Sequence, residues 1–242
     1  MPRISLEGHE ERVFSQNGED GVTRRIIDSL YGADCYYKCY VEFGVEDGCE
    51  CNTRILREKY YWTGLLLDGG FERPELNLRK HFITRENIVQ LLNQYHMPKR
   101  LNLLSVDVDR NDFYILDEIL HHYRADVIIC EYNSTHPPEE DKVVVYEPLA
   151  VWDFTDYFGA SLLALSRMLL NHGYVLVYTD KMGVNAFFVD LGKLDERGLQ
   201  FSSMADVSAL YHPPLYGKNN NGHQPDPHFR KYVSSREALS RR

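Results

Sequence analysis

Carboxylates end two apolar stretches of this sequence. Asp107 and Asp109 close the run LLSVDVD, and Glu131 and Asn133 close the run DVIICEYN. Nearly continuous apolar runs are typical of central parallel strands, because both faces of such strands are buried. Neighbouring strands lie about 5 Å apart, so these carboxylates would crowd together. A crowded group holds a metal ion or an amine, or it keeps one carboxyl protonated with a raised pKa, ready to act as a base. Salt-bridged carboxylates at a sheet edge are the alternative.

The types of side chain indicate which metal such a group would take. The oxygen atoms of Asp109, Glu131 and Asn133 suit Mg²⁺, Ca²⁺ or Mn²⁺ better than zinc. The five cysteines lack the two-residue gap of common zinc motifs, and we expect reduced, partly buried thiols. The ten histidines show no metal-ligand spacing, and we expect most of them at the surface.

A glycine turn follows the first apolar run, in the stretch VEFGVEDGCECNTRIL (Val41–Leu56). Gly44 and Gly48 remain where a dinucleotide fingerprint would have three glycines, and Glu46 and Asp47 would repel a pyrophosphate. S-adenosylmethionine has no phosphate and carries a sulfonium and an ammonium, so an acidic turn suits it. A strand-to-helix turn with solvated acids is the alternative interpretation.

Asp68 ends the next apolar run, GLLLD, about 20 residues beyond the first glycine. An acid at this place accepts hydrogen bonds from both ribose hydroxyls of an adenosine ligand. NAD would use such an acid equally, so Asp68 does not choose between cofactors. A helix N-cap is the alternative role.

The elements that must position these residues alternate between strands and helices. Helical spacing predicts helices over Ser15–Leu30 and Ser161–His172. The last two strands are separated only by residues 181–183, so they must pair antiparallel. We therefore predict a Rossmann-like α/β fold, in which helices cover both faces of a seven-stranded, mostly parallel sheet with a C-terminal antiparallel hairpin. The expected strands are Tyr40–Gly44, Thr63–Asp68, a short one at His81–Thr84, Leu101–Val108, Asp126–Tyr132, Tyr174–Tyr178 and Val184–Val189.

Length and composition limit the class of protein. A chain of 242 residues fits one domain, predicted over 1–210, with a C-terminal tail over 211–242 that is rich in Pro, Asn and Gly and is either a lid or mobile. The net charge of −9 argues against nucleic-acid binding. No apolar run approaches the roughly 20 residues needed to span a bilayer, and the N-terminus has no apolar signal core. We expect a cytoplasmic protein.

Several segments, in this order along the chain, resemble the FkbM-like branch of class I S-adenosylmethionine-dependent methyltransferases. The resemblance covers roughly residues 15–190, which is most of the chain. The segments that carry it are SQNGED (Ser15–Asp20), YVEFGVEDGCECNT (Tyr40–Thr53), YWTGLLLDG (Tyr61–Gly69), ENI (Glu86–Ile88), LLSVDVDRND (Leu103–Asp112), IICEYNS (Ile128–Ser134), YFGASLLAL (Tyr157–Leu165) and GVNAFFV (Gly183–Val189).

The resemblance implies a role for each matching residue. Asp68 would hold the ribose, and Asp107 would face the sulfonium. Asp109, Glu131 and Asn133 would supply a catalytic base or ligands for a divalent metal. The resemblance further places Glu42, Gly44 and Gly48 around the methionine part, Asn52 and Thr53 at the start of the next helix, Asn87 and Ile88 beside the adenine, and Gln16 and Asp20 across the site from the first helix.

The function expected from these residues is O-methylation of a small-molecule acceptor, a hydroxyl of a sugar or secondary metabolite. Asp109 or Glu131 would take the acceptor proton, alone or with Mg²⁺ or another divalent cation. A non-catalytic binding or scaffold module on the same fold is one alternative, and a nucleotide-dependent dehydrogenase is another. The acceptor, the need for a metal and homo-oligomerisation are left open by the sequence.

Overall fold

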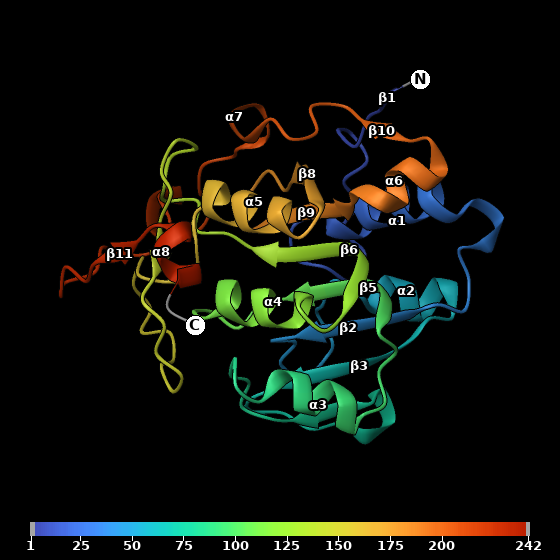
Figure 1. The fold of residues 1–242 in the computed structure, drawn as a ribbon, viewed down its shortest axis with the longest axis horizontal. Helices are drawn as coiled ribbons and strands as arrows, with labels where there is room; N and C mark the ends of the chain where they lie inside the picture. Colours follow the sequence, from blue (N-terminus) through green and yellow to red (C-terminus); the bar gives the residue numbers. More distant parts are fainter. Residues whose placement is uncertain (1–2, 241–242) are drawn as a thin grey trace.

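A seven-stranded sheet forms the centre of the computed structural model, which describes residues 3–240 (Figure 1). The strand order is β4-β3-β2-β5-β6-β9-β8, and β9 alone runs against the other six. The fold is the expected Rossmann-like α/β fold, a mostly parallel sheet with a C-terminal antiparallel hairpin. Its strands are β2 (Cys39–Phe43), β3 (Thr63–Asp68), β4 (Leu78–Lys80), β5 (Arg100–Val106), β6 (Arg124–Glu131), β8 (Tyr174–Thr179) and β9 (Asn185–Asp190).

The antiparallel hairpin between β8 and β9 is confirmed, and one side chain closes its turn. The carboxylate of Asp180 accepts hydrogen bonds from the backbone N–H groups of Met182, Val184 and Asn185. Gly183 has a φ of 77° in the same turn, a conformation that favours glycine. The hairpin inserts β9 between β6 and β8, so the start of β9 lies beside the end of β6.

Helices cover both faces of the sheet (Figure 1). The strand side chains alternate between two cores: Leu65 and Leu67 of β3 belong to one, and Leu66 belongs to the other. The first core is covered by α3 (Ile88–Gln94), α4 (Asp112–Leu120) and α5 (Leu162–Asn171). The second is covered by α1 (Glu19–Tyr31), α2 (Arg54–Tyr60) and α6 (Leu191–Arg197).

Two predicted elements differ in the structure. The short strand expected at His81–Thr84 is wrong: β4 lies at Leu78–Lys80, where the buried side chain of Leu78 joins the second core. The first helix begins at Glu19 rather than Ser15. The Asp20 carboxylate holds the chain before the helix as a loop, because it accepts hydrogen bonds from the N–H groups of residues 13, 14 and 15.

The remaining elements lie at the margins of the sheet. Segments of the region 211–240 pack against the loop that follows β6, at the edge where the parallel strands end (Figure 1). No helix among residues 3–240 is long and apolar enough to cross a membrane. The smaller elements are β1 (Arg3–Ile4) paired with β10 (Gln200–Phe201), β7 (Val143–Val144) paired with β11 (Tyr232–Val233), α7 (Val207–Leu210), α8 (Ser235–Ser240), and the 3-10 turns Gly32–Asp34, Pro74–Leu76 and Lys218–Asn220.

Candidate active site

A cavity of about 640 Å³ lies at the carboxyl ends of β2, β3, β5 and β6. The chain order of the sheet reverses here, because β2 has β3 on one side and β5 on the other. Ligands of doubly wound sheets bind at this position. The volume is within the range of small-molecule sites. The start of β9 and two segments far apart in sequence, 12–19 and 215–223, complete the wall.

The wall of this cavity is strongly acidic. Among the described residues that line it, Arg12 is the one arginine, and it lies 3.8 Å from the carboxylate of Glu50. A cavity with this excess of carboxylates attracts cations and repels phosphates. The acidic lining residues are Glu19, Glu42, Glu46, Glu50, Asp68, Asp107, Asp109 and Glu131.

Glu42 lines the cavity and also anchors the start of α2. Its Oε1 accepts a hydrogen bond from the N–H of Asn52 at 2.7 Å, and its Oε2 accepts from the N–H of Thr53 at 2.9 Å and from the Thr53 hydroxyl at 2.5 Å. Burial raises the pKa of Glu42, although these hydrogen bonds act in the opposite direction. Asn52, which also lines the cavity, donates from its side chain to the Ser105 hydroxyl at 3.1 Å.

The two glycines of the turn have different positions. Gly44 lines the cavity with a φ of 68°, and a Cβ atom there would lie 1.7 Å from the carbonyl oxygen of Asp107. The backbone after β2 therefore touches the backbone after β5. Gly48 lies outside the cavity lining, with a φ of 75° and its N–H bonded to Val45, so it shapes the turn.

Asp68 lines the cavity, and its carboxylate organises two loops. Its Oδ2 accepts a hydrogen bond from the N–H of Glu46 at 2.9 Å, and its Oδ1 accepts from the N–H groups of Gly70 and Phe71 at 2.7 and 3.1 Å. A carboxylate has about four lone-pair positions, so acceptor capacity remains on Asp68 for a ligand.

The acids after β5 and β6 form the crowded group that their spacing predicts. Burial, and then repulsion from Asp109 and Asp112, raises the pKa of Asp107 well above its usual range. Burial, followed by repulsion from Asp107, does the same to the pKa of Glu131. Burial raises the pKa of Asp112 to about 7. Atoms Oε2 of Glu131 and Oδ2 of Asp112 are buried and have no hydrogen-bond partner in the described part of the chain.

Asp109 lies in a strained turn at the edge of this group. Its φ of 63° belongs to the left-handed region, which few residues other than glycine adopt. The turn is held on both sides: Asp112 accepts a hydrogen bond from the N–H of Val108 at 2.6 Å, and the buried Arg110 lies 3.1 Å from a carboxylate oxygen of Glu147. Strain of this kind clusters at functional sites.

Asn133 was expected among the metal ligands, but the structure uses both ends of its amide elsewhere. Its Nδ2 donates to the carbonyl oxygens of Asp156 and Phe158 at 2.8 and 2.9 Å, and its Oδ1 accepts from the N–H of Thr135 at 3.2 Å. Asn133 is fully buried and lies outside the cavity lining. It therefore positions the loop that brings Phe158 to the cavity.

Asn87 and Ile88, expected beside an adenine, also lie outside the cavity lining. The Asn87 side chain accepts from the N–H of Thr84 at 2.9 Å and donates to the carbonyl of Phe82 at 2.8 Å, at the start of α3. Ile88 is fully buried in the first core. A contact between these residues and a nucleoside stays a prediction.

Gln16 lines the cavity, whereas Asp20 lies outside the lining and holds the loop that carries Gln16. The neighbouring Glu19 also lines the cavity, and its carboxylate accepts from the side-chain amide of Asn185 at 2.8 Å. This contact joins the start of α1 to the start of β9.

An aromatic group in the cavity lining was missed in the sequence. His223 lies at its centre: the ring centroid of Trp152 is 4.5 Å away, that of Tyr216 is 5.1 Å away and that of Phe158 is 5.6 Å away. Burial lowers the pKa of His223. Two of these residues belong to the tail, where the only sequence signal was aromatic residues within a stretch rich in Pro, Asn and Gly.

Comparison with known proteins gives structural similarity alone. The sequence matches no protein-family model and no curated protein. An O-methyltransferase family protein from Burkholderia thailandensis is 7% identical with a TM-score of 0.43, over 72% of this chain and 57% of that one. The CMeT domain of the citrinin polyketide synthase is 10% identical with a TM-score of 0.41, over 71% and 51%.

Phosphoethanolamine N-methyltransferase 1 from Haemonchus contortus, in complex with phosphoethanolamine and S-adenosylhomocysteine, is 12% identical with a TM-score of 0.38, over 92% of this chain and 45% of that one. This chain thus spans about half the length of these three solved structures. At such low identity and TM-score, these similarities assign neither a cofactor nor an activity to the protein.

Proposed function

We propose that the protein transfers a methyl group from S-adenosylmethionine to a hydroxyl of a small-molecule acceptor. The observation that carries this proposal is the acidic cavity at the position where the order of the sheet reverses. A ligand of this cavity must tolerate or neutralise many carboxylates, which excludes pyrophosphate cofactors. S-adenosylmethionine combines an adenosine with a sulfonium and an ammonium, so its charges complement the wall.

The ends of β2, β3 and β5 offer suitable groups for each part of this cofactor. Asp68 has acceptor capacity left for the ribose hydroxyls. The backbone at Gly44 carries no side chain, so a methionine moiety can approach it closely. Asp107 lies against Gly44. A sulfonium bound beside the Asp107 carboxylate would relieve the repulsion that Asp109 and Asp112 exert on it.

The aromatic group supports an acceptor with flat or apolar faces, such as a sugar ring or a secondary metabolite. Trp152 and Tyr216 line the cavity and pack against the ring of His223. Methyl transfer is an in-line displacement: the S–CH₃ bond breaks while the O–CH₃ bond forms, and the hydroxyl proton passes to a base. The loop that carries Trp152 and the tail segment 215–223 would enclose the acceptor, align it with the methyl donor and exclude water.

Glu131 is the base that the geometry favours. Its Oε2 is buried and has no partner in the described part of the chain, and the residue lines the cavity. Burial, followed by repulsion from Asp107, raises its pKa well above the usual range, so in the empty site it holds a proton more readily than an ordinary carboxyl group. The sulfonium of the cofactor would lower this pKa again, so the carboxylate becomes a base when the methyl donor is bound. Asp109 is more exposed, and it is the second candidate for this role.

A divalent cation fits the site less well. Oxygen donors suit Mg²⁺, but Asn133 has no free oxygen for a metal, because its amide is occupied by Asp156, Phe158 and Thr135. Among the described residues, the cavity acids do not form a group of three whose ligand atoms all lie within 4.8 Å of one another. The residues at this site therefore do not fit a divalent cation, and metal assistance stays a prediction.

Calorimetry with S-adenosylmethionine and S-adenosylhomocysteine tests the cofactor. We expect saturable binding of both at one site, and at least about tenfold weaker binding in Asp68→Asn, since an amide accepts fewer hydrogen bonds than a carboxylate. Asp47→Asn is the matched control, because Asp47 is an acid of the neighbouring turn after β2 and lies outside the cavity lining. Absence of binding at millimolar ligand would refute the proposal.

Catalysis is tested separately from binding. Glu131→Gln should retain S-adenosylhomocysteine binding and lose about 100-fold or more of the methyl transfer to any acceptor found in a screen of hydroxylated compounds. Full transfer by this variant would reject Glu131 as the base. An S-adenosylmethionine-binding protein whose cellular role survives this substitution would instead be a binding module.

A further inference from the structure

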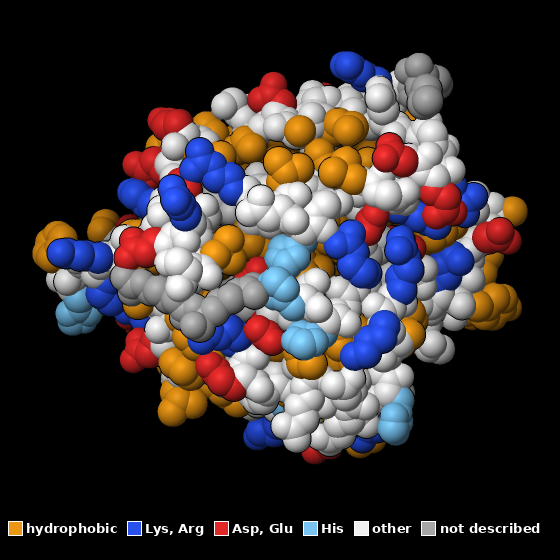
Figure 2. Space-filling view, viewed as in Figure 1, with side chains coloured by type: hydrophobic (Ala, Val, Ile, Leu, Met, Phe, Trp, Pro, Cys, Tyr) orange, Lys and Arg blue, Asp and Glu red, His pale blue; other side chains and the backbone are white. Residues whose placement is uncertain are grey.

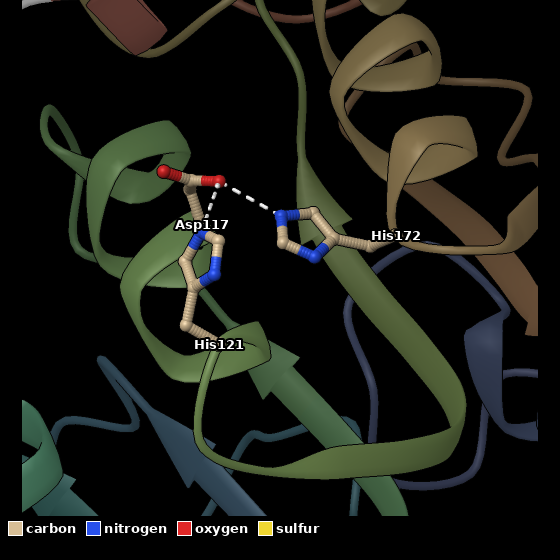
Figure 3. Close-up of side chains that lie close together, drawn as sticks. All are labelled: Asp117, His121 and His172. Carbon is tan, nitrogen blue, oxygen red and sulfur yellow. Dashed lines mark hydrogen bonds and ion pairs between the residues drawn. The ribbon is translucent and has the colours of Figure 1, made fainter.

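Three metal-ligating side chains lie together at the ends of α4 and α5, outside the cavity lining (Figure 3). Asp117 belongs to α4, and His121 and His172 are the C-cap residues that directly follow α4 and α5. Figure 3 shows both imidazole rings directed toward the same oxygen of the carboxylate. In the view of Figure 2, histidine side chains are visible at the surface of the face that carries these helices.

The distances within this group are close to those of a metal site. The Nε2 of His172 lies 2.8 Å from Oδ1 of Asp117, and the Nε2 of His121 lies 3.6 Å from the same oxygen. The three ligand atoms all lie within 4.8 Å of one another. A tetrahedral zinc ion, with bonds of about 2.0–2.1 Å, separates adjacent ligand atoms by about 3.3 Å. The two separations from Asp117 differ from this value by about 0.3 to 0.5 Å, and small side-chain rotations would bring the two imidazoles to the same ion.

The electrostatic surroundings favour a cation. Asp117 is only 5% exposed, so its negative charge is poorly solvated. The carbonyl ends of two helices also meet here, since His121 and His172 are the C-caps of α4 and α5. The C-terminal end of a helix carries a partial negative charge. A cation bound between the two helix ends would neutralise the carboxylate and both partial charges.

We propose that Asp117, His121 and His172 bind one divalent transition-metal ion, with zinc as the best match. Two imidazoles and one carboxylate suit Zn²⁺, Co²⁺ and Ni²⁺, whereas Mg²⁺ prefers oxygen ligands alone. The side chain of His121 is 40% exposed, which leaves a fourth position open to water. The group meets the distance condition that the cavity acids do not meet.

The expected role of this ion is structural. It would join the ends of α4 and α5, two helices that pack against each other and cover the first core. Helix α4 starts at Asp112, one of the crowded acids, and α5 starts just after the segment that contributes Phe158. Fixing the far ends of both helices would therefore stabilise two walls of the cavity.

Metal titration of the full-length protein without an affinity tag tests this site. After removal of metals with EDTA, we expect calorimetry with ZnCl₂ to show one equivalent of binding that is weakened at least about tenfold by His121→Gln and by His172→Gln. His122→Gln is the matched control: His122 is the next residue in the chain, 48% exposed, with its Nε2 3.2 Å from Glu118. The zinc affinity of His122→Gln should stay within about twofold of the wild-type affinity.

Two further measurements keep the test decisive. Co²⁺ bound by this group should give the visible absorption of a tetrahedral complex, and this band should vanish in His172→Gln. Zinc should raise the melting temperature of the wild type but not that of His121→Gln, whose exposed side chain can be replaced without disturbing the core. The proposal is overturned by the absence of saturable zinc binding, by unchanged binding in both histidine variants, or by an equal loss in His122→Gln.

Discussion

Gly44 lies directly against the carbonyl oxygen of Asp107, and a Cβ atom built on Gly44 would lie 1.7 Å from that oxygen. The contact joins the ends of β2 and β5 at the floor of the cavity. Gly44→Ala adds this clash to a φ of 68°, where a side chain is strained in any case. We expect a loss of about 2–4 kcal/mol in the free energy of unfolding, measured by urea denaturation, and a matching loss of S-adenosylhomocysteine affinity.

Gly69→Ala is the control for this prediction. A Cβ atom at Gly69 would meet only Phe82, at an ordinary contact distance of 3.9 Å. The free energy of unfolding of this variant should remain within about 0.5 kcal/mol of that of the wild type. Wild-type stability and affinity in Gly44→Ala would show that the junction of β2 and β5 tolerates a side chain.

Glu42 stabilises the start of α2 rather than serving the cavity alone. Glu42→Ala leaves the N–H groups of Asn52 and Thr53 without their acceptor, so we expect a loss of about 2–4 kcal/mol in the free energy of unfolding. Thr53→Val removes only the hydroxyl donor and should lower the free energy of unfolding by about 1 kcal/mol. Urea denaturation of the two variants checks this order. An equal cost would show that the hydroxyl, and not the backbone contacts, dominates the anchor.

Much of the fold followed from local sequence patterns. The buried strands were found because each lies between helices on both sides and therefore reads as an unbroken apolar run, as in Leu65–Leu67. The hairpin followed from a connection too short for a parallel crossover. The edge strand β4 was misplaced by three residues, because so short a strand at the sheet edge shows no such run.

The site was only partly predictable, for a physical reason. Asp68, Asp107 and Glu131 end strands, so the topology of the sheet fixes their neighbours. The aromatic group around His223 depends on how the tail folds back over the sheet, which no local pattern encodes. Part of the Asp117, His121 and His172 group was detectable in the sequence, because Asp117 and His121 are four residues apart and so share one helix face. The third residue, His172, follows α5, and no local pattern links it to the other two.

The crowded acids predict an unusual dependence of stability on pH. The pKa of Asp112 is about 7 in the folded protein, because the carboxyl is buried, and near 3.9 in an unfolded chain. At this carboxyl the folded state thus binds more protons between these values, so the contribution of Asp112 to stability is lost as pH rises from about 4 to about 7. Asp112→Asn should reduce this slope. Thermal unfolding across the range checks it, and an unchanged slope would assign the effect to the other acids.

The charge of the cofactor provides the sharpest test of the acidic site. S-adenosylmethionine carries a sulfonium that S-adenosylhomocysteine lacks, and burial raises the pKa of Glu131 and of Asp107 well above the usual range in the empty site. A cation favours the ionised carboxylates, so the affinity for S-adenosylmethionine should rise with pH as these groups ionise, whereas that for S-adenosylhomocysteine should change less.

Calorimetry in two buffers of different ionisation enthalpy measures the linked protons directly. S-adenosylmethionine should release more protons from the protein than S-adenosylhomocysteine at neutral pH, and Glu131→Gln should shrink this difference because the group that ionises is gone. Glu50→Gln is a suitable control, since Glu50 also lines the cavity but its side chain is 55% exposed. Equal proton release with both ligands would mean that the sulfonium does not lie beside the acids that follow β5 and β6.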